Sequence, residues 1–352
     1  MKDIVIVIPA YNPSKKLIEL VDSLILLNFS KIIIVNDGSI KGKSIFRTVK
    51  EKTECLILEY KENKGKGYAL KYAINYYLEN LKNNYKGIVT VDADYQHLPN
   101  DVLNIALRLL GNQDSLILGI RDFYEKGVPT PNRFGNRLTS FIFKLLYGEN
   151  IKDTQTGLRG IPNRYLNLCL EASGKRFEFE MNMLIKFVKQ KINIIQIPIE
   201  TVYYKRGESK FNKWIDSILI YKVIFTEYIK FLLSSLICSF LDIILFTTFL
   251  NIFSNLNNNL KIILGTFISR IIADFFNFNI NKNFVFISHE NSKKIFCKYY
   301  LLSFSKMLTS ASLVLIFHNL FNNCSETVLK IIVDVFIYLI SYKIQKKYIF
   351  KT

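Results

Sequence analysis

Two carboxylates two residues apart are the first groups in this sequence that could do chemistry. Asp92 and Asp94 follow the apolar run Gly87-Ile88-Val89-Thr90-Val91 and precede Gln96. Alternation in an extended chain points residues i and i+2 to the same side. Mg²⁺ and Mn²⁺ prefer oxygen ligands, and Mg²⁺ is usually held by one or two carboxylates plus substrate phosphates. These residues therefore predict a divalent-cation site suited to a nucleotide diphosphate, with a solvated turn as the alternative.

Buried strands must position these groups, and the first third of the chain has the pattern of a parallel α/β sheet. Continuous apolar runs at 4–8, 31–35, 56–58 and 87–91 predict strands buried on both faces. One helical pattern at 14–27 separates the first two runs, and a second, which the segment 63–70 opens and which continues to residue 80, separates the last two. Pro9-Ala10-Tyr11-Asn12 and Asn36-Asp37-Gly38-Ser39 directly follow the first two runs. Ligands of open α/β sheets lie outside the carboxyl ends of the strands, so we expect both segments at the site.

A glycine turn precedes the second helical pattern. In Asn63-Lys64-Gly65-Lys66-Gly67 the glycines would let backbone N–H groups approach an anion, and both lysines add positive charge. A plain N-terminal turn of a helix is the alternative, because a single Gly-x-Gly is a weak signal.

Length and composition indicate two unequal parts. The chain has 352 residues and a formal net charge of +18, which favours an anionic partner such as a membrane surface, nucleotide phosphates or nucleic acid. No motif supports nucleic-acid binding. The five cysteines are scattered without a Cys-x-x-Cys pair, which argues against a disulfide framework and a zinc site.

Beyond about residue 230 the sequence becomes strongly apolar. Four segments, at about 231–253, 262–280, 299–320 and 328–344, are near the 20 residues that a membrane-crossing helix needs. Lysines concentrate in 282–298 and in the tail, which places both termini and the amino-terminal part in the cytoplasm. The sequence thus predicts a multi-pass protein of the cytoplasmic membrane. Five charged residues lie in these segments and would pair with one another: Asp242, Arg270, Asp274, Lys306 and Asp334. Alternatively, Arg270 and Lys306 would meet a lipid phosphate.

Two further patterns concern the membrane. Residues 132–147 and 213–230 read as amphipathic helices with basic and aromatic faces, suited to a bilayer interface, although the first could instead pack against the sheet. Residues 277–286 and 341–350 form a weak internal repeat, which predicts a pair of helical hairpins.

Together these segments resemble glycosyltransferase family 2, whose catalytic domains have the GT-A fold, and especially its dolichyl- or polyprenyl-phosphate sugar synthases. The resemblance rests on Pro9-Ala10-Tyr11-Asn12, Asn36-Asp37-Gly38-Ser39, Asn63-x-Gly65-x-Gly67-x-Ala69 and Asp92-x-Asp94-x-Gln96-His97, in this order. Gly119-Ile120-Arg121, Arg133-Phe134-Gly135-Asn136-Arg137, the segment 153–159, the segment 177–181 and Ile197-Pro198-Ile199 extend it to about residue 212. Tyr203 to Phe211 resembles the closing loop of the family, with Ser209-Lys210-Phe211 where relatives often have Ser-His-Phe. Residues 228–350 resemble the GtrA-like membrane family.

The resemblance implies a role for each matching residue. The expected donor-binding residues are Pro9, Tyr11, Asn12, Asp37, Lys64, Gly65 and Asp92. Asp92, Asp94 and Gln96 would hold Mg²⁺ or Mn²⁺, and Asp92, Asp94 and Asp153 form the expected catalytic set, with Asp153 in a positioning role. Arg121, Arg133 and Arg137 would grip the acceptor phosphate, with a solvated basic face as the alternative.

The sequence therefore predicts an α/β GT-A domain at 1–212, a juxtamembrane amphipathic helix at 213–230 and a four-helix, GtrA-like transmembrane domain at 231–352. The implied enzyme is an inverting glycosyltransferase that moves a hexose from a nucleotide-diphosphate sugar, expected to be a UDP-sugar, to polyprenyl phosphate for cell-envelope glycans. The sequence leaves open whether the chain forms a homo-oligomer. The alternatives are a GDP-mannose-dependent synthase and an inactive scaffold or transporter for lipid-linked sugars. A processive synthase is disfavoured because the residues before the single tryptophan, Trp214, do not form Gln-x-x-Arg-Trp.

Overall fold

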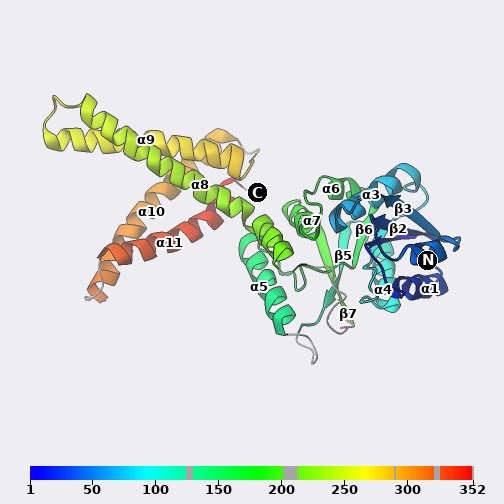
Figure 1. The fold of residues 1–352 in the computed structure, drawn as a ribbon. Coiled ribbons are helices and arrows are strands. Elements are labelled where there is room, and N and C mark those ends of the chain that lie inside the picture. Colours follow the sequence, from blue (N-terminus) through cyan, green and yellow to red (C-terminus); the bar gives the residue numbers. More distant parts are fainter. Residues whose placement is uncertain (124–129, 201–211, 213, 289–290, 321–325, 351–352) are drawn as a thin grey trace. The chain divides into compact units, whose positions relative to one another are not determined.

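The computed structural model describes residues 1–352 except 124–129, 201–211, 213, 289–290, 321–325 and 351–352. The chain forms two compact units, Met1–Ile224 and Phe225–Thr352 (Figure 1). The predicted closing loop, Tyr203 to Phe211, lies outside the described residues.

The first unit is built on a seven-stranded sheet in the order β3-β2-β1-β4-β6-β5-β7. The strands are β1 (Ile4–Ala10), β2 (Ile32–Asp37), β3 (Cys55–Tyr60), β4 (Gly87–Thr90), β5 (Ser115–Arg121), β6 (Arg159–Pro162) and β7 (Asn193–Ile199). Only β6 runs antiparallel to its neighbours β4 and β5. The sheet is therefore mostly parallel, as predicted, and the four strands expected from apolar runs are present.

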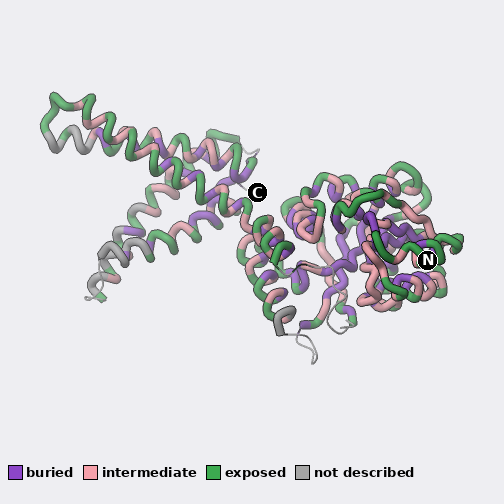
Figure 2. Tube along the Cα trace, in the orientation of Figure 1, coloured by how far each residue is buried: buried purple, intermediate pink, exposed green. Residues whose placement is uncertain are grey.

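Helices cover both faces of this sheet. They are α1 (Lys16–Leu26), α2 (Lys43–Lys50), α3 (Lys66–Asn80), α4 (Pro99–Gly111), α5 (Thr130–Tyr147), α6 (Leu166–Leu170) and α7 (Glu178–Lys189), with a 3₁₀ turn, η1 (Asn163–Tyr165), before α6. Val5 and Val7 pack into a core with α3, α6 and α7, whereas Ile4, Ile6 and Ile8 pack into a second core with α1 and α4. Successive strand residues point to opposite faces, so a strand covered on both sides is apolar throughout (Figure 2).

The second unit is helical in its described part. It contains most of α8 (Ile215–Ile252), then α9 (Asn258–Ile280), α10 (Ser292–Leu320) and α11 (Glu326–Ile344), with π-helical turns η2 (Asn281–Val285) and η3 (Gln345–Phe350). Each of the four predicted apolar segments falls mainly within one of these helices. Among the described residues, only α8 is long and apolar enough to be identified as a candidate membrane span. The predicted amphipathic helix and first span are one unbroken helix, α8.

The weak sequence repeat corresponds to a local two-fold arrangement. Both copies end in a π-helical turn, η2 and η3. The equivalent residues Phe286 and Phe350 stack with ring centroids 4.9 Å apart. Equivalent cross-contacts join Phe286 to Tyr342 and Phe350 to Phe278, at 5.8 and 6.1 Å. The repeat is therefore a structural one, and its two copies pack against each other.

Candidate active site at the carboxyl end of β4

Asp92 and Asp94 lie beyond the end of β4 in a turn. The strand stops at Thr90, and Tyr95 has a positive φ of 60°, an uncommon conformation for a non-glycine residue. Strand alternation is therefore the wrong explanation for the proximity of the two carboxylates, because the chain turns between them. The turn is closed by a hydrogen bond from the Gln96 backbone N–H to Asp94 Oδ1, at 3.2 Å.

The Asp92 carboxylate is held between two nitrogen groups. Lys66 Nζ lies 2.6 Å from Asp92 Oδ1, and His97 Nε2 lies 3.3 Å from Asp92 Oδ2. Burial by itself would raise the pKa of Asp92, but the Lys66 ammonium and His97 outweigh it and hold that pKa below its usual range. Asp92 is therefore a fixed negative charge at the carboxyl end of β4.

Lys66 also contacts a second buried acid. Its Nζ lies 3.1 Å from Oε1 of Glu180, whose side chain is 5% exposed. Burial by itself would lower the pKa of Lys66, but the carboxylates of Asp92 and Glu180 raise it above the usual value. The ammonium thus remains charged and joins α3 to α7 directly beside Asp92.

A buried arginine braces this arrangement. The Arg159 side chain donates hydrogen bonds to the backbone oxygens of Thr156 (2.8 Å), Glu180 (2.8 Å) and Thr154 (3.3 Å). It thereby fixes the 154–157 segment against α7. Gly157 in this segment approaches Asp92 so closely that an added Cβ would lie 2.4 Å from Asp92 Oδ2.

The predicted glycine turn binds an internal carboxylate. Asp37, at the end of β2, accepts hydrogen bonds from the backbone N–H groups of Lys64 (2.7 Å) and Gly65 (3.0 Å) and from the Tyr60 hydroxyl (2.8 Å). The glycines also permit close packing, since a Cβ on Gly67 would lie 2.4 Å from Phe179 Cβ. Donor binding by Asp37, Lys64 and Gly65 therefore remains a prediction, made of groups that already hold this turn together.

The segment after β1 is joined to the segment after β2. The Asn12 side-chain oxygen accepts hydrogen bonds from the backbone N–H groups of Ile40 (2.9 Å) and Lys41 (2.8 Å), and the Asn12 N–H donates to Ser39 Oγ (2.8 Å). Pro9 and Tyr11 are half-buried on either side of Ala10 at the end of β1. The structure thus places these predicted donor-binding residues at the carboxyl ends of neighbouring strands.

Asp153 forms an ion pair with Arg121. Arg121, the last residue of β5, donates from Nε to Asp153 Oδ2 at 2.6 Å and from Nη2 to Oδ1 at 3.0 Å. Asp153 is fully buried, whereas the Arg121 side chain is 19% exposed. A bidentate pair of this kind fixes the plane of the guanidinium. The geometry is consistent with the predicted positioning role of Asp153.

Helix α5 carries the other two predicted acceptor residues. Arg133 is half-buried and Arg137 is exposed near the start of this helix. The helix is bonded to the segment around Asp153, since Ser140 Oγ donates to the Lys152 backbone oxygen at 3.1 Å. This contact brings α5 to the Asp153 segment, which in turn holds Arg121.

The predicted metal ligands fit a hard cation by their chemistry. Among the described residues, no three His, Cys, Asp or Glu side chains form a ready-made metal cluster. Asp94 has a raised pKa, first because it is buried and second because of the negative charge of Asp92. A divalent cation would relieve this repulsion, and Asp94 with the Gln96 amide would leave coordination positions for substrate phosphates.

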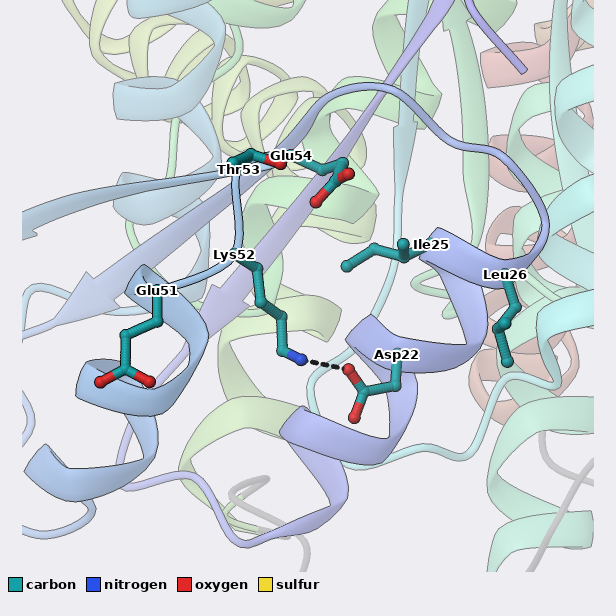
Figure 3. A pocket seen from close by; sticks show the side chains of 7 residues that line it. All are labelled: Asp22, Ile25, Leu26, Glu51, Lys52, Thr53 and Glu54. Atoms are coloured by element: carbon teal, nitrogen blue, oxygen red, sulfur yellow. Dashed lines mark hydrogen bonds and ion pairs between the residues drawn. The ribbon is translucent and has the colours of Figure 1, made fainter.

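A separate groove lies on the first unit between α1 and the connection from α2 to β3. It is lined by Asp22, Ile25, Leu26, Glu51, Lys52, Thr53 and Glu54, and Lys52 contacts Asp22 across it (Figure 3). Its lining contains none of the residues described above, so it does not belong to the candidate active site.

Sequence reasoning missed four contributors to this site: His97 as a partner of Asp92, and Glu180, Arg159 and Gly157. All four lie in motifs that match the family resemblance. Two of the roles depend on contacts over long sequence separations, such as the 114 residues between Lys66 and Glu180, whereas His97 lies only five residues from Asp92.

A mostly parallel sheet with Asp92 and Asp94 at the end of its central strand β4 is a GT-A domain, the fold of a large class of glycosyltransferases. The family model "Glycosyl transferase family 2" matches residues 5–167, and "GtrA/DPMS, transmembrane domain" matches residues 230–350. The chain belongs to glycosyl transferase family 2, carries a GtrA/DPMS-type membrane domain and is a glycosyltransferase.

Curated relatives share the first part of the chain. A UDP-N-acetylglucosamine–dolichyl-phosphate N-acetylglucosaminyltransferase from Methanococcus voltae is 31% identical over 228 residues, covering 57% of this chain and 86% of the relative. An uncharacterized protein from Methanocaldococcus jannaschii is 29% identical over 212 residues, covering 59% and 85%. Among solved structures, glucosyl-3-phosphoglycerate synthase from Mycobacterium tuberculosis has a TM-score of 0.49 at 15% identity and covers 64% of this chain and 79% of its own.

Proposed function

We propose that this enzyme transfers a hexose from a UDP-sugar to a membrane-embedded polyprenyl phosphate, with inversion at the anomeric carbon. The product would be a lipid-linked sugar donor for cell-envelope glycans. The observation that carries the proposal is the Glu180–Lys66–Asp92 ion-pair series beside Asp94 and Gln96. It supports the proposal because binding a sugar diphosphate and its cation requires fixed charges of this kind. The name of the Methanococcus voltae relative contains both UDP-N-acetylglucosamine and dolichyl phosphate, which supports this choice of substrates.

The donor half of the site would work through fixed charges. Asp94 and Gln96 would hold a divalent cation, and that ion would neutralise negative charge developing on the leaving diphosphate. Asp92, held by Lys66 and His97, would orient the sugar. Because Lys66 and His97 restrain the Asp92 carboxylate, it need not reorganise during the reaction, which is the main requirement for electrostatic catalysis.

The acceptor half would work without a general base. A phosphate monoester has its second pKa near about 6, so at neutral pH it is already mostly ionised and nucleophilic. Arg121 would grip this phosphate, with its guanidinium fixed by Asp153, and Arg133 and Arg137 on α5 would add charge. Asp153 would thus position Arg121 rather than accept a proton.

The surface of α5 supports an acceptor drawn from the bilayer. Phe134, Leu138, Phe141 and Leu145 are 68, 37, 63 and 46% exposed and recur at helical spacing. An exposed apolar stripe among basic residues suits the membrane interface. In α8, Leu236, Ile237 and Phe240 are likewise 58–66% exposed, as expected for a helix facing lipid. We infer four membrane spans, with the catalytic domain and both termini in the cytoplasm.

Transfer of label into lipid tests the proposal. Detergent-solubilised protein would be incubated with polyprenyl phosphate, Mn²⁺ or Mg²⁺ and each of a panel of labelled nucleotide sugars, and the organic-extractable label counted. Label from a UDP-sugar is expected, with loss in EDTA and in Asp94→Ala. Asp114→Ala is the matched control and should retain activity, because Asp114 directly precedes β5 and so lies at the amino end of that strand, away from the carboxyl ends that form the candidate site.

Other outcomes would redirect the assignment. Label from GDP-mannose alone would replace the UDP-sugar by the alternative donor. Folded protein that binds nucleotide but labels no lipid with any donor would refute the lipid acceptor and favour an inactive scaffold or a transporter for lipid-linked sugars.

A further inference from the structure

A cavity of about 470 Å³ lies within the second unit, where the end of α9, the turn η2 and the start of α10 meet. Its lining includes three aromatic residues, two lysines and a cysteine: Phe275, Phe278, Phe296, Lys282, Lys293 and Cys297. None of the described residues that line it is acidic. The cavity therefore combines apolar surface with positive charge only.

The aromatic side of the cavity is anchored in the core of the unit. Phe278 is 3% exposed and packs edge-on against Phe296 and Tyr299, with ring centroids 5.3 and 5.4 Å apart. Phe275 is 50% exposed. This wall thus has a buried base and an open apolar surface.

The internal repeat shows that Lys282 has an unusual environment. Its equivalent in the second copy, Lys346, has its Nζ 2.8 Å from Oε1 of buried Glu227, so a protein carboxylate neutralises it. Lys282 Nζ instead donates to the hydroxyl of Ser292 at the start of α10. The same sequence position is therefore an internal ion pair in one copy and a cationic cavity wall in the other.

We propose that this cavity binds the phosphate monoester headgroup of a lipid, with Lys282 and Lys293 on the phosphate and the first part of the apolar chain on the phenylalanine wall. A phosphate monoester carries a charge of about −1.5 to −2 at neutral pH, which two lysines balance better than they balance the single charge of a phosphodiester. Basic pockets between membrane helices are suited to phosphate headgroups. Naming the lipid as polyprenyl phosphate rests on the proposed function; the cavity would then be a second, non-catalytic site for the acceptor.

Protection of Cys297 provides a direct test. Cys297 lines the cavity and is exposed, so its reaction with N-ethylmaleimide can be followed by peptide mass spectrometry in the full-length protein. Farnesyl phosphate, inorganic phosphate and phosphatidylglycerol would be compared as protecting probes. At a farnesyl phosphate concentration ten times Kd, alkylation should slow about elevenfold, because only about one molecule in eleven has an empty site.

Matched lysine variants identify the site. Lys282→Gln and Lys293→Gln should each weaken farnesyl phosphate about tenfold, since each removes a charge-assisted contact. Lys293→Arg keeps the charge and should retain binding. Lys294→Gln, which removes a neighbouring exposed charge that does not line the cavity, should change Kd less than about twofold.

The remaining outcomes are decisive. No protection by farnesyl phosphate, equal protection by inorganic phosphate or phosphatidylglycerol, or equal weakening by Lys294→Gln would each overturn the proposal. Failure of this site is distinguishable from failure of the proposed function: Asp94→Ala should abolish sugar transfer while protection of Cys297 is unchanged. In the wild-type protein, sugar transfer without protection of Cys297 would overturn the cavity site alone. Protection without transfer in the wild-type protein would support the cavity site and refute the catalytic assignment.

Discussion

Replacing Gly157 by alanine tests whether Asp92 must stay where Lys66 and His97 hold it. The added Cβ would lie 2.4 Å from Oδ2 and 2.8 Å from Cγ of Asp92, whereas ordinary van der Waals contact begins at 3.4 Å. The carboxylate must therefore move by about 1 Å, the difference between 3.4 and 2.4 Å. A 1 Å misplacement of a catalytic group can cost about 10²-fold in rate. We expect kcat/KM to fall about a hundredfold, which corresponds to about 2.7 kcal/mol of transition-state stabilisation.

The assay is the transfer of labelled sugar into extractable lipid, measured with the thermal unfolding of the same samples. Gly111→Ala is the control, because Gly111 ends α4 and its added Cβ would meet nothing within 4 Å. If the Gly157→Ala variant folds normally and keeps kcat/KM within about threefold of wild type, the position of Asp92 is not critical and this reasoning is refuted.

Three further predictions follow from the same contacts. Lys66→Met should lower the free energy of unfolding by about 3 kcal/mol, because it leaves Asp92 and Glu180 without their shared cation. It should therefore lower the temperature of the first unfolding transition, and the double variant Lys66→Met/Glu180→Met should recover at least half of that decrease. No recovery would contradict the ion-pair argument. Asp153→Asn should raise KM for polyprenyl phosphate about tenfold, because the Arg121 guanidinium loses its fixed partner, while nucleotide affinity stays constant. An equal loss of nucleotide affinity would argue against a role of Asp153 confined to the acceptor. A fluorescent probe on Phe141→Cys in nanodiscs should be quenched by brominated lipid. A probe on Leu107→Cys, at an exposed position of α4, should not be quenched, and equal quenching would contradict membrane contact by α5.

The elements of the catalytic domain were predictable where burial on both faces makes a strand apolar throughout. The runs at 4–8 and 31–35 identified β1 and β2, and the periodic pattern after Gly65 identified α3 through Asn80. The interior strand β5, the edge strand β7 and the antiparallel strand β6 were not predicted as strands. Strand β6 has only four residues, Arg159–Pro162, too few to show a period, and its direction depends on pairing with β4 and β5.

The residue types of the candidate active site could be chosen from the sequence, whereas their contacts could not. The Asp92-x-Asp94-x-Gln96 spacing predicts a cation-binding segment, and this stays a prediction. The expectation that an extended strand aligns the two carboxylates is wrong, since the segment is a turn. For the glycine turn, the sequence left open an anion-binding loop and a plain N-terminal turn of a helix. In the structure its amides bind the carboxylate of Asp37. A substrate phosphate or the carboxylate of Asp37 could each accept hydrogen bonds from the amides of this local sequence.

By itself, the sequence determined the family, the order of the two parts of the chain and the residue types of the site, because apolar periodicity and motif spacing are local properties. Only the tertiary structure decided which of these residues contact one another. Lys66 meets Glu180, Arg121 meets Asp153 and Gly157 meets Asp92 across separations of 32 to 114 residues. Such pairings depend on the strand order of the sheet and on the packing of α7 against α3, and neither is encoded in any single stretch of the chain.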